Sequence, residues 1–169
     1  VLQTLTGRNV YNGGKGGESS TQIKDRMILD NGKYFYSVII EAGRNNFSDS
    51  TTVLADIASM VAALGHTRYI ILSVPNGSAE PNPSTGYSQI IAINNRLSAI
   101  YGAHYLDFRS YLVSQYNPGI PQDVIDHAND VPPSSLRIDA VHYTATGYSL
   151  IANYIYSQKI TTLVPATAK

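Results

Sequence analysis

The sequence predicts an α/β fold in three layers, in which helices cover both faces of a parallel, flavodoxin-like sheet. Two observations predict this fold. Residues 34–43 and 68–74 are largely apolar and β-branched runs, which are typical of strands buried on both faces. Residues 49–64 and 87–101 carry apolar side chains at helical spacing, so a helix follows each of these strands. Strands that alternate with helices favour a parallel sheet covered on both sides.

The N-terminal part of the chain predicts a short strand, a glycine turn and a helix. Residues 9–12 contain a short apolar run, and residues 13–17 hold four glycines in five positions. Glycine lets the backbone take positive φ angles and approach a ligand closely. Beyond this turn, capping side chains and the apolar residues Ile23, Met27 and Ile28 predict the first helix. A phosphate-binding loop is the competing interpretation, but no G-x-x-x-x-G-K-[ST] pattern occurs in the chain.

The strongest predicted strand, 34–43, is followed by the polar residues Arg44, Asn45 and Asn46. Open α/β sheets place their ligands at the carboxyl ends of their strands. An asparagine amide in this position can donate a hydrogen bond to a substrate oxygen. A turn without a binding role explains the same residues, because asparagine is a favoured turn residue.

The second half of the chain is less regular. A short strand at 104–108 is followed by a helical turn through Leu112, and residues 117–135 hold four prolines around one short helix. Acidic residues and a histidine gather in that region, so a metal site is conceivable there. We interpret them instead as solvated and helix-capping residues, and we predict no metal and no cofactor. The residues concerned are Asp123, Asp126, His127 and Asp130. Residues 164–169 are expected to form a tail.

Near the C-terminal end of the chain, Asp139 precedes His142 by three residues, directly before an apolar pattern at helical spacing. This spacing lets one loop carry two members of a hydrolytic triad. The carboxylate would hold the imidazole in one tautomer, and the imidazole would act as general base on a hydroxyl nucleophile. A capped helix start with a surface histidine would produce the same short pattern. Polar residues at the ends of the earlier strands favour the catalytic interpretation.

The composition excludes several classes of protein. The chain has 169 residues, enough for one domain, and its 12 basic and 12 acidic residues balance. This balance argues against a nucleic-acid partner, and no apolar stretch approaches the ~20 residues of a membrane-spanning helix. The absence of cysteine excludes a disulfide framework and a thiol nucleophile. The 13 tyrosines suit a surface that faces carbohydrate, and we expect an extracytoplasmic or secreted protein.

Three short motifs, taken in their order along the chain, resemble those of the SGNH or GDSL hydrolase family. The first is an asparagine followed by glycines, from Asn12 to Gly17. The second is Gly43-Arg44-Asn45-Asn46 at the end of a predicted strand, and the third is the D-x-x-H block from Asp139 to His142. The resemblance covers roughly residues 10–156. It implies a single domain of the SGNH-hydrolase fold over residues 1–169.

The resemblance also implies a role for individual residues. His142 would be the general base, and Asp139 would orient it. The backbone N–H of Gly17 and the side-chain amide of Asn45 would form an oxyanion hole. The family cleaves esters, often acetyl groups on sugars, through a serine acyl-enzyme and needs no metal. The remaining candidates, for substrate binding, are Arg44, Asn46 and Asn12.

The chain departs from the family pattern in two places. Asn46 stands where the family usually has aspartate, and the G-D-S block that carries the nucleophilic serine is absent. Ser19 and Ser20 lie in the first of the three motifs and are not assigned as the nucleophile. In the family, the missing segment also supplies a strand inside the sheet. We therefore expect an N-terminally incomplete domain, completed by a segment with G-D-S upstream of Val1 or on another chain.

The leading hypothesis from sequence is a serine-type ester hydrolase that removes acyl groups, in particular O-acetyl groups, from an acylated carbohydrate. The alternative is a non-catalytic module of the same fold that binds a glycan or a receptor. A nucleotide-binding flavodoxin-like domain would use the glycine turn for phosphate, but it would leave Asp139 and His142 without a role.

Overall fold

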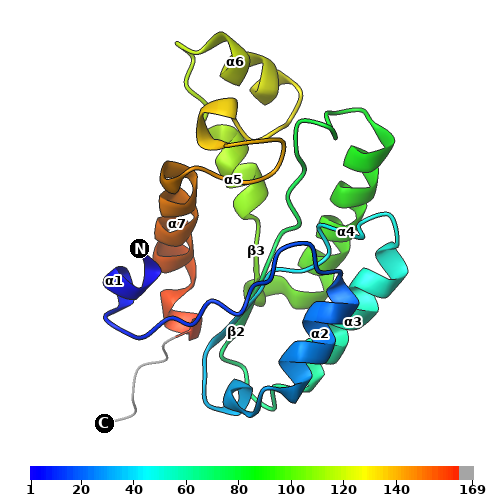
Figure 1. The fold of residues 1–169 in the computed structure, drawn as a ribbon, viewed down its shortest axis with the longest axis vertical. Coiled ribbons are helices and arrows are strands. Elements are labelled where there is room, and N and C mark those ends of the chain that lie inside the picture. Colours follow the sequence, from blue (N-terminus) through cyan, green and yellow to red (C-terminus); the bar gives the residue numbers. More distant parts are fainter. Residues whose placement is uncertain (164–169) are drawn as a thin grey trace.

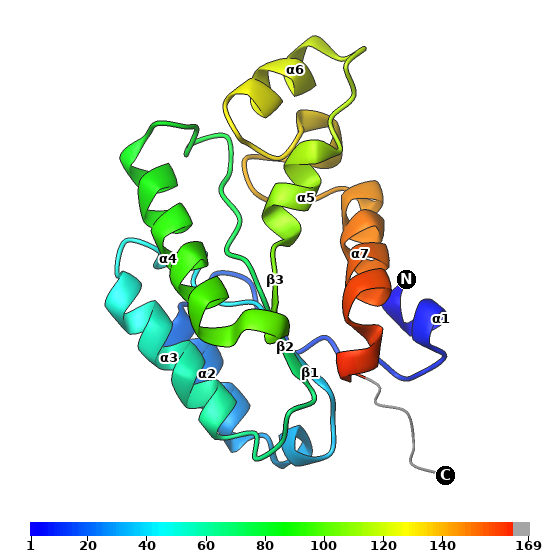
Figure 2. The same ribbon diagram turned by 180° about the vertical axis from the view of Figure 1, so that it is seen from behind.

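Three parallel strands form the sheet, in the order β1-β2-β3 (Figures 1 and 2). The structure is a computed structural model that describes residues 1–163, so the tail predicted at 164–169 lies outside the described residues. β1 (Val38–Ile40) pairs in parallel with β2 (Tyr69–Leu72). β2 pairs in parallel with β3 (Tyr105–Leu106). The α/β class and the parallel sheet predicted from sequence are confirmed.

Helices cover both faces of this sheet, which gives the three predicted layers (Figures 1 and 2). One outer layer consists of α2 (Ser20–Leu29), α3 (Ser50–Ala62) and α4 (Thr85–Tyr101). The opposite layer contains α5 (Phe108–Ser114) and α7 (Ala145–Leu163). The two long helices predicted at 49–64 and 87–101 correspond to α3 and α4.

Two shorter helices lie outside these layers. α1 (Leu2–Thr6) packs against α7, and both views place it beside that helix (Figures 1 and 2). α6 (Pro121–Ala128) is the one short helix predicted within residues 117–135, and it begins with proline at its first position. Proline suits this position because its missing N–H would have no partner in the helix. Within residues 1–163, three single turns of 3-10 helix complete the set of elements: η1 (Asn31–Tyr34), η2 (Gly102–His104) and η3 (Ser134–Leu136).

The alternation of side chains along β2 separates two hydrophobic cores. Ile71 faces the core on the α3 and α4 side, which it shares with Ile57. Ile70 and Leu72 face the core on the α5 and α7 side, which they share with Ile151. Burying one such side chain fully contributes about 1.5–3 kcal/mol, so both layers are held to the sheet by their apolar faces. Among the described residues, no helix has the length and apolar character needed to cross a membrane.

The predicted strands are longer than the observed ones, and one of them is absent. Residues 9–12 form no strand, so that prediction is wrong; no neighbouring strand within residues 1–163 offers them hydrogen-bond partners. Tyr34, Phe35 and Tyr36 are exposed, and they lie at η1 and just beyond it, so β1 begins only at Val38. The predicted strand is too long because these exposed aromatic residues extend the apolar run of β1. The strand predicted at 104–108 shortens to β3.

Among the described residues, β1 has a strand partner on one side only. In a parallel ladder, alternate residues point their N–H and C=O groups to opposite sides of the strand. The Val38 N–H donates to the Arg68 carbonyl at 2.9 Å, so the backbone groups of Ile39 point the other way. The part of the chain that the structure describes places no strand on that side. The sheet therefore has an open edge at β1.

Candidate active site

The D-x-x-H block forms the loop between η3 and α7, and it brings its acid and histidine together. His142 Nδ1 lies 2.7 Å from Asp139 Oδ2. The other carboxylate oxygen, Asp139 Oδ1, accepts the backbone N–H of Val141 at 2.9 Å and that of His142 at 2.8 Å. The backbone N–H of Ile138 donates to the His142 carbonyl at 2.9 Å and closes the loop. The aspartate is thus held by the same turn that carries the histidine.

These hydrogen bonds also set the charge of the pair. The backbone N–H of His142 holds the pKa of Asp139 well below its usual range, with further contributions from the Val141 N–H and the imidazole. An ionised carboxylate accepts the Nδ1–H, which leaves Nε2 as the basic nitrogen of the ring. The side chains of His142 and Asp139 are 65% and 55% exposed. Hydrogen bonds within the turn, rather than burial, therefore order this pair.

A cavity of about 430 Å³ lies beside His142, at the carboxyl ends of β1 and β2. Parallel sheets place ligands at this end, and the volume lies in the range of small-molecule sites. The cavity is lined by the glycine turn, the segments that follow β1 and β2, and the loop around His142, together with Ile23 of α2 and the first turns of α7. The lining residues that the sequence analysis singled out are Gly17, Arg44, Asn45 and His142.

Gly17 and Asn45 lie on the same cavity although they are far apart in the sequence. The Asn45 side-chain amide donates to the Glu18 carbonyl at 2.9 Å, which ties the glycine turn to the end of β1. Gly17 has a φ of 81°, a left-handed conformation that favours glycine. An amide nitrogen carries two N–H groups, so this contact leaves Asn45 one further donor.

Gly43 forms the turn between β1 and the residues that line the cavity, Arg44 and Asn45. Its φ is 104°, and a Cβ at this position would lie 2.6 Å from Cγ1 of Val53. Glycine is therefore required both by the backbone angle and by the close approach of α3. The turn at Gly43 places Arg44 and Asn45 on the cavity rather than along a continued strand.

The other three candidates for substrate binding have different surroundings. Arg44 lines the cavity, and its Nη2 donates to both carboxylate oxygens of Glu80 at 3.1 and 2.9 Å. Asn46 accepts the Ser20 N–H at 3.0 Å and donates to Ser20 Oγ at 2.9 Å, so it joins α2 to the loop after β1. Asn12 accepts the Gly14 N–H at 2.9 Å in the glycine turn. Neither asparagine is among the residues that line the cavity.

No Ser, Thr or Cys side chain is among the described residues that line this cavity. Ser19 caps α2, because its side chain accepts the Gln22 N–H and the Gln22 side chain accepts the Ser19 N–H. Ser20 is buried and donates to Asp56 at 2.7 Å. Both hydroxyls therefore hold structure in place, and neither is positioned as a nucleophile for His142.

Three further residues on the cavity were not predicted from sequence. Tyr143 is 5% exposed, and its hydroxyl has no hydrogen-bond partner among the described residues. Tyr148 is half exposed and packs edge-to-face on Tyr143, with ring centroids 5.8 Å apart. Glu41 is exposed on the wall of the cavity, and desolvation by the surrounding protein raises the pKa of its carboxyl to about 7.

The acidic cluster at 123–130 ties the irregular region together. Asp123 is fully buried and accepts hydrogen bonds from Ser134 and Ser135 at 2.6–2.9 Å. Asp126 is buried as well and pairs with Arg137 at 2.8 Å. The prediction that these residues are solvated is therefore wrong for Asp123 and Asp126, because both carboxylates are buried and accept hydrogen bonds from neighbouring residues. Within residues 1–163, no group of three or more His, Cys, Asp or Glu side chains could hold a metal ion.

The fold is similar to that of a solved bacterial protein. That protein, from Bacteroides fragilis, is assigned as an acylhydrolase, and its crystal structure aligns with a TM-score of 0.65. The alignment covers 88% of this chain and 73% of the other, at 21% sequence identity. At this identity the likeness establishes the shared α/β fold.

One curated relative is similar in sequence, and no protein-family model matches the chain. The relative is the tail spike protein of Salmonella phage epsilon15, which is 33% identical over 113 residues. The match covers 64% of this chain and 10% of the tail spike protein. The chain thus spans about a tenth of the length of the curated relative that it matches.

Proposed function

We propose that this chain provides the acid–base half of a serine-type ester hydrolase that removes acyl groups, in particular O-acetyl groups, from carbohydrates. The observation that carries the proposal is the Asp139–His142 pair, with 2.7 Å between its oxygen and nitrogen, at a cavity that Gly17 and Asn45 also line. The fold shared with an acylhydrolase supports it.

The proposed reaction begins with proton transfer from a serine hydroxyl to His142 Nε2. The serine oxygen attacks the acyl carbon, and the negative charge moves to the carbonyl oxygen. The Gly17 N–H and the remaining Asn45 N–H would donate to that oxyanion, and each such donor lowers a barrier by about 3–4 kcal/mol. Asp139 keeps the ring oriented and stabilises the imidazolium as it forms.

The intermediate then collapses, and the imidazolium gives its proton to the departing sugar oxygen. The acyl group stays on the serine as an ester until water, deprotonated by the same imidazole, attacks it. A second collapse releases the carboxylic acid and returns the proton to serine. In this scheme the serine belongs to a segment upstream of Val1 or on another chain, because no hydroxyl of this cavity among the described residues fits that role.

The carbohydrate part of the proposal rests on the cavity and on the phage relative. Arg44, Asn45 and Glu41 offer hydrogen-bonding groups, and the exposed ring of Tyr148 offers an apolar face. Sugars present both kinds of surface. The relative is a tail spike protein of a phage, which supports an extracellular role and a glycan ligand for this chain.

A non-catalytic glycan- or receptor-binding module is the second candidate function. The observation that favours it is the lack of a Ser, Thr or Cys side chain on this cavity within the described part of the chain. Such a module would use the same polar cavity for binding and would have no need of an ordered Asp139–His142 pair.

The test is acetate release from O-acetylated xylan and from O-acetylated bacterial polysaccharide, followed by proton NMR. The protein is the whole polypeptide as its source encodes it. We expect release by the wild type and a loss of about 10³-fold or more in His142→Ala. His127→Ala is the control, because His127 is exposed and stacks on Tyr116 away from this cavity. Glycan binding without acetate release, unchanged in His142→Ala, would favour the binding module instead.

A further inference from the structure

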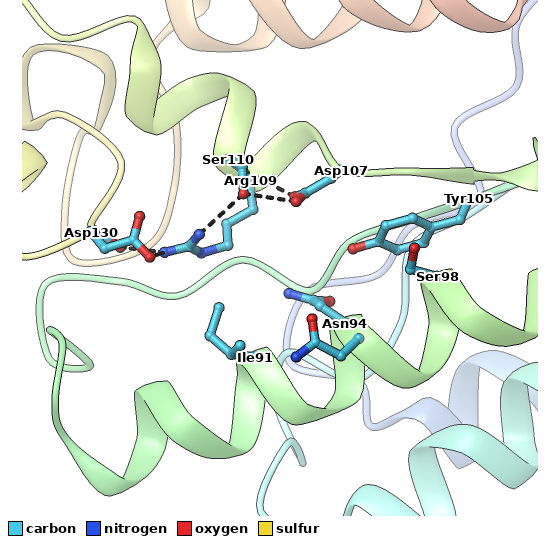
Figure 3. A pocket seen from close by; sticks show the side chains of 9 residues that line it. Ile91, Asn94, Ser98, Tyr105, Asp107, Arg109, Ser110 and Asp130 are labelled. Carbon is cyan, nitrogen blue, oxygen red and sulfur yellow. Dashed lines mark hydrogen bonds and ion pairs between the residues drawn. The ribbon is translucent and has the colours of Figure 1, made fainter. Parts of the chain in front are cut away.

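A second cavity, of about 450 Å³, lies between α4 and the start of α5, beside β3 (Figure 3). It shares no lining residue with the cavity at His142. Both cavities adjoin the segment that follows β2. Val74 of this segment lines the first cavity. Asn94 lines the second cavity and hydrogen bonds to the Val74 backbone. Its lining residues are Ile91, Asn94, Asn95, Ser98, Tyr105, Asp107, Arg109, Ser110 and Asp130.

Two of the polar groups that line this cavity, Arg109 and Asn94, are buried and held by hydrogen bonds. Arg109 is 3% exposed; its Nε donates to Asn76 at 2.8 Å, and its Nη2 contacts Asp130. Asn94 accepts the Val74 N–H at 2.7 Å and donates to the Val74 carbonyl at 2.9 Å. These bonds fix the side chains in place, so the cavity is rigid before any ligand arrives.

The walls near the opening present free hydrogen-bonding groups on facing elements. Asn95 and Ser98 are exposed, and their spacing places them on one face of α4. The structure gives neither side chain a hydrogen-bond partner among residues 1–163. Opposite them, Asp107 accepts the Ser110 N–H at 3.0 Å and the Ser110 hydroxyl at 2.7 Å, and carboxylate oxygens have further lone pairs. Hydroxyl and carboxylate groups thus lie on separate walls of the cavity: Figure 3 shows Ser98 on α4, and Asp107 with Ser110 at the start of α5.

Charge decides between the classes of ligand that such a cavity could take. Two carboxylates, Asp107 and Asp130, line the cavity with one guanidinium, Arg109, which pairs with Asp130. The net negative charge of this lining disfavours an anion. No metal-binding group of three side chains occurs in the described part of the chain. The only large apolar surfaces of the lining are Ile91 and the ring of Tyr105. A neutral ligand with many hydroxyl groups and a partly apolar face fits this combination.

We propose that this second cavity is a binding site for a neutral saccharide unit. The walls of α4 and α5 hydrogen bond to its hydroxyls, and Tyr105 and Ile91 contact its C–H face. The volume is in the range of sites for small ligands. This site works independently of the Asp139–His142 pair, so it would serve an esterase and a pure binding module alike.

The test is saturation-transfer NMR on the protein with the methyl glycosides of glucose, galactose, mannose, rhamnose and N-acetylglucosamine. We expect at least one of them to bind, with backbone amide shifts concentrated at 91–98 and 105–110. The double variant Asn95→Ala, Ser98→Ala removes two hydrogen-bonding side chains from an exposed helix face, and affinity should fall about tenfold. Ser88→Ala, also exposed on α4 but away from the cavity, should bind like the wild type.

Two results would overturn the assignment. One is the absence of saturation transfer to all five glycosides. The other is binding that the double variant leaves unchanged, which would place the saccharide elsewhere. His142→Ala should keep full saccharide affinity at this cavity, so a failure of the esterase proposal and a failure of this one are told apart.

Discussion

Asp139 accepts hydrogen bonds from two backbone N–H groups and one imidazole, all within four residues of chain. This geometry makes the pair a local structure, since it needs neither a buried site nor a distant partner. The carboxylate remains ionised through the ordinary pH range because those bonds lower its pKa. The catalytic proposal therefore depends on a carboxylate that is ordered while it is exposed.

Asp139→Asn tests this dependence. An asparagine amide can present its N–H to Nδ1 and favour the wrong tautomer, so we expect kcat to fall by about 10³–10⁴-fold. The assay is hydrolysis of p-nitrophenyl acetate by the whole encoded polypeptide. Asp25→Asn, an exposed acid on α2, is the control and should keep wild-type activity. Equal activity of the two variants would contradict the proposed role of Asp139.

Glu41 predicts a dependence of stability on pH. Its pKa is raised in the folded protein, from an ordinary value of 4.5 to about 7, so the folded state binds the extra proton. Its contribution is fully present below pH 4.5 and is lost as pH rises toward 7. Relative to Glu41→Gln, the wild type should therefore lose free energy of unfolding across this window, as measured by urea unfolding.

Glu18→Gln is the matched control for this measurement. Arg26 lowers the pKa of Glu18, so its contribution has the opposite sign and is lost as pH falls below about 4.5. A wild-type protein that gains stability relative to Glu41→Gln between pH 4.5 and 7 would contradict the assignment of Glu41.

At the scale of elements, the join between β1 and the loop that carries Arg44 and Asn45 is a tight one. Gly43 combines a φ of 104° with a Cβ position only 2.6 Å from Val53, whereas Gly65, after α3, has a φ of 66° and open space around it. Substituting each glycine by alanine therefore separates two contributions to stability: the strain of a positive φ, which both positions share, and the close packing, which affects Gly43 alone.

Gly43→Ala should destabilise the protein by about 2–5 kcal/mol, since it adds overpacking against α3 to the strain of a left-handed alanine. Gly65→Ala meets only the backbone term and should cost about 1–2 kcal/mol. Urea unfolding followed by circular dichroism measures both. Equal losses in the two variants would mean that α3 does not pack against Gly43 as described.

At the scale of the whole molecule, apolar patterns that extend over many residues predicted secondary structure better than short apolar runs did. The apolar spacing over 49–64 and 87–101 predicted α3 and α4 because each helix buries one face against the sheet. The runs at 9–12 and 34–36 misled, since their aromatic side chains lie on the surface: Tyr11 stacks on Tyr36 with ring centroids 5.6 Å apart. A short apolar run does not reveal whether a neighbouring strand exists to pair with it.

The candidate site was predictable in part. Motifs at the ends of predicted elements pointed to Gly17, Asn45 and His142, which the structure brings to one cavity; their chemical roles remain predictions. Glu41 could not be predicted in this way, because it lies within the run 34–43 that predicts a buried strand and belongs to no motif. The ion pair of Arg44 with Glu80 joins residues 36 positions apart, and only the fold reveals it. The second cavity, between α4 and α5, carries no sequence motif that could have revealed it.

The open edge of β1 bears on two predictions: that a strand is missing from the sheet, and that the nucleophilic serine lies on another segment. One segment that pairs with β1 could account for both. An exposed strand edge presents unpaired N–H and C=O groups to any strand that can reach it. A segment that pairs there would lie next to the loop of Gly43 to Asn45, at the wall of the cavity that His142 lines. The proposal that a serine-bearing segment completes this site must therefore be tested on the assembled protein.

The most direct measurement is labelling of the whole encoded polypeptide with a fluorophosphonate, followed by peptide mapping with mass spectrometry. The account predicts one labelled serine, located outside residues 1–169, with labelling lost in His142→Ala and kept in His127→Ala. Labelling of Ser19 or Ser20, or labelling that persists in His142→Ala, would contradict it. A folded polypeptide that takes up no label at all would contradict the esterase proposal and leave the chain as a binding module.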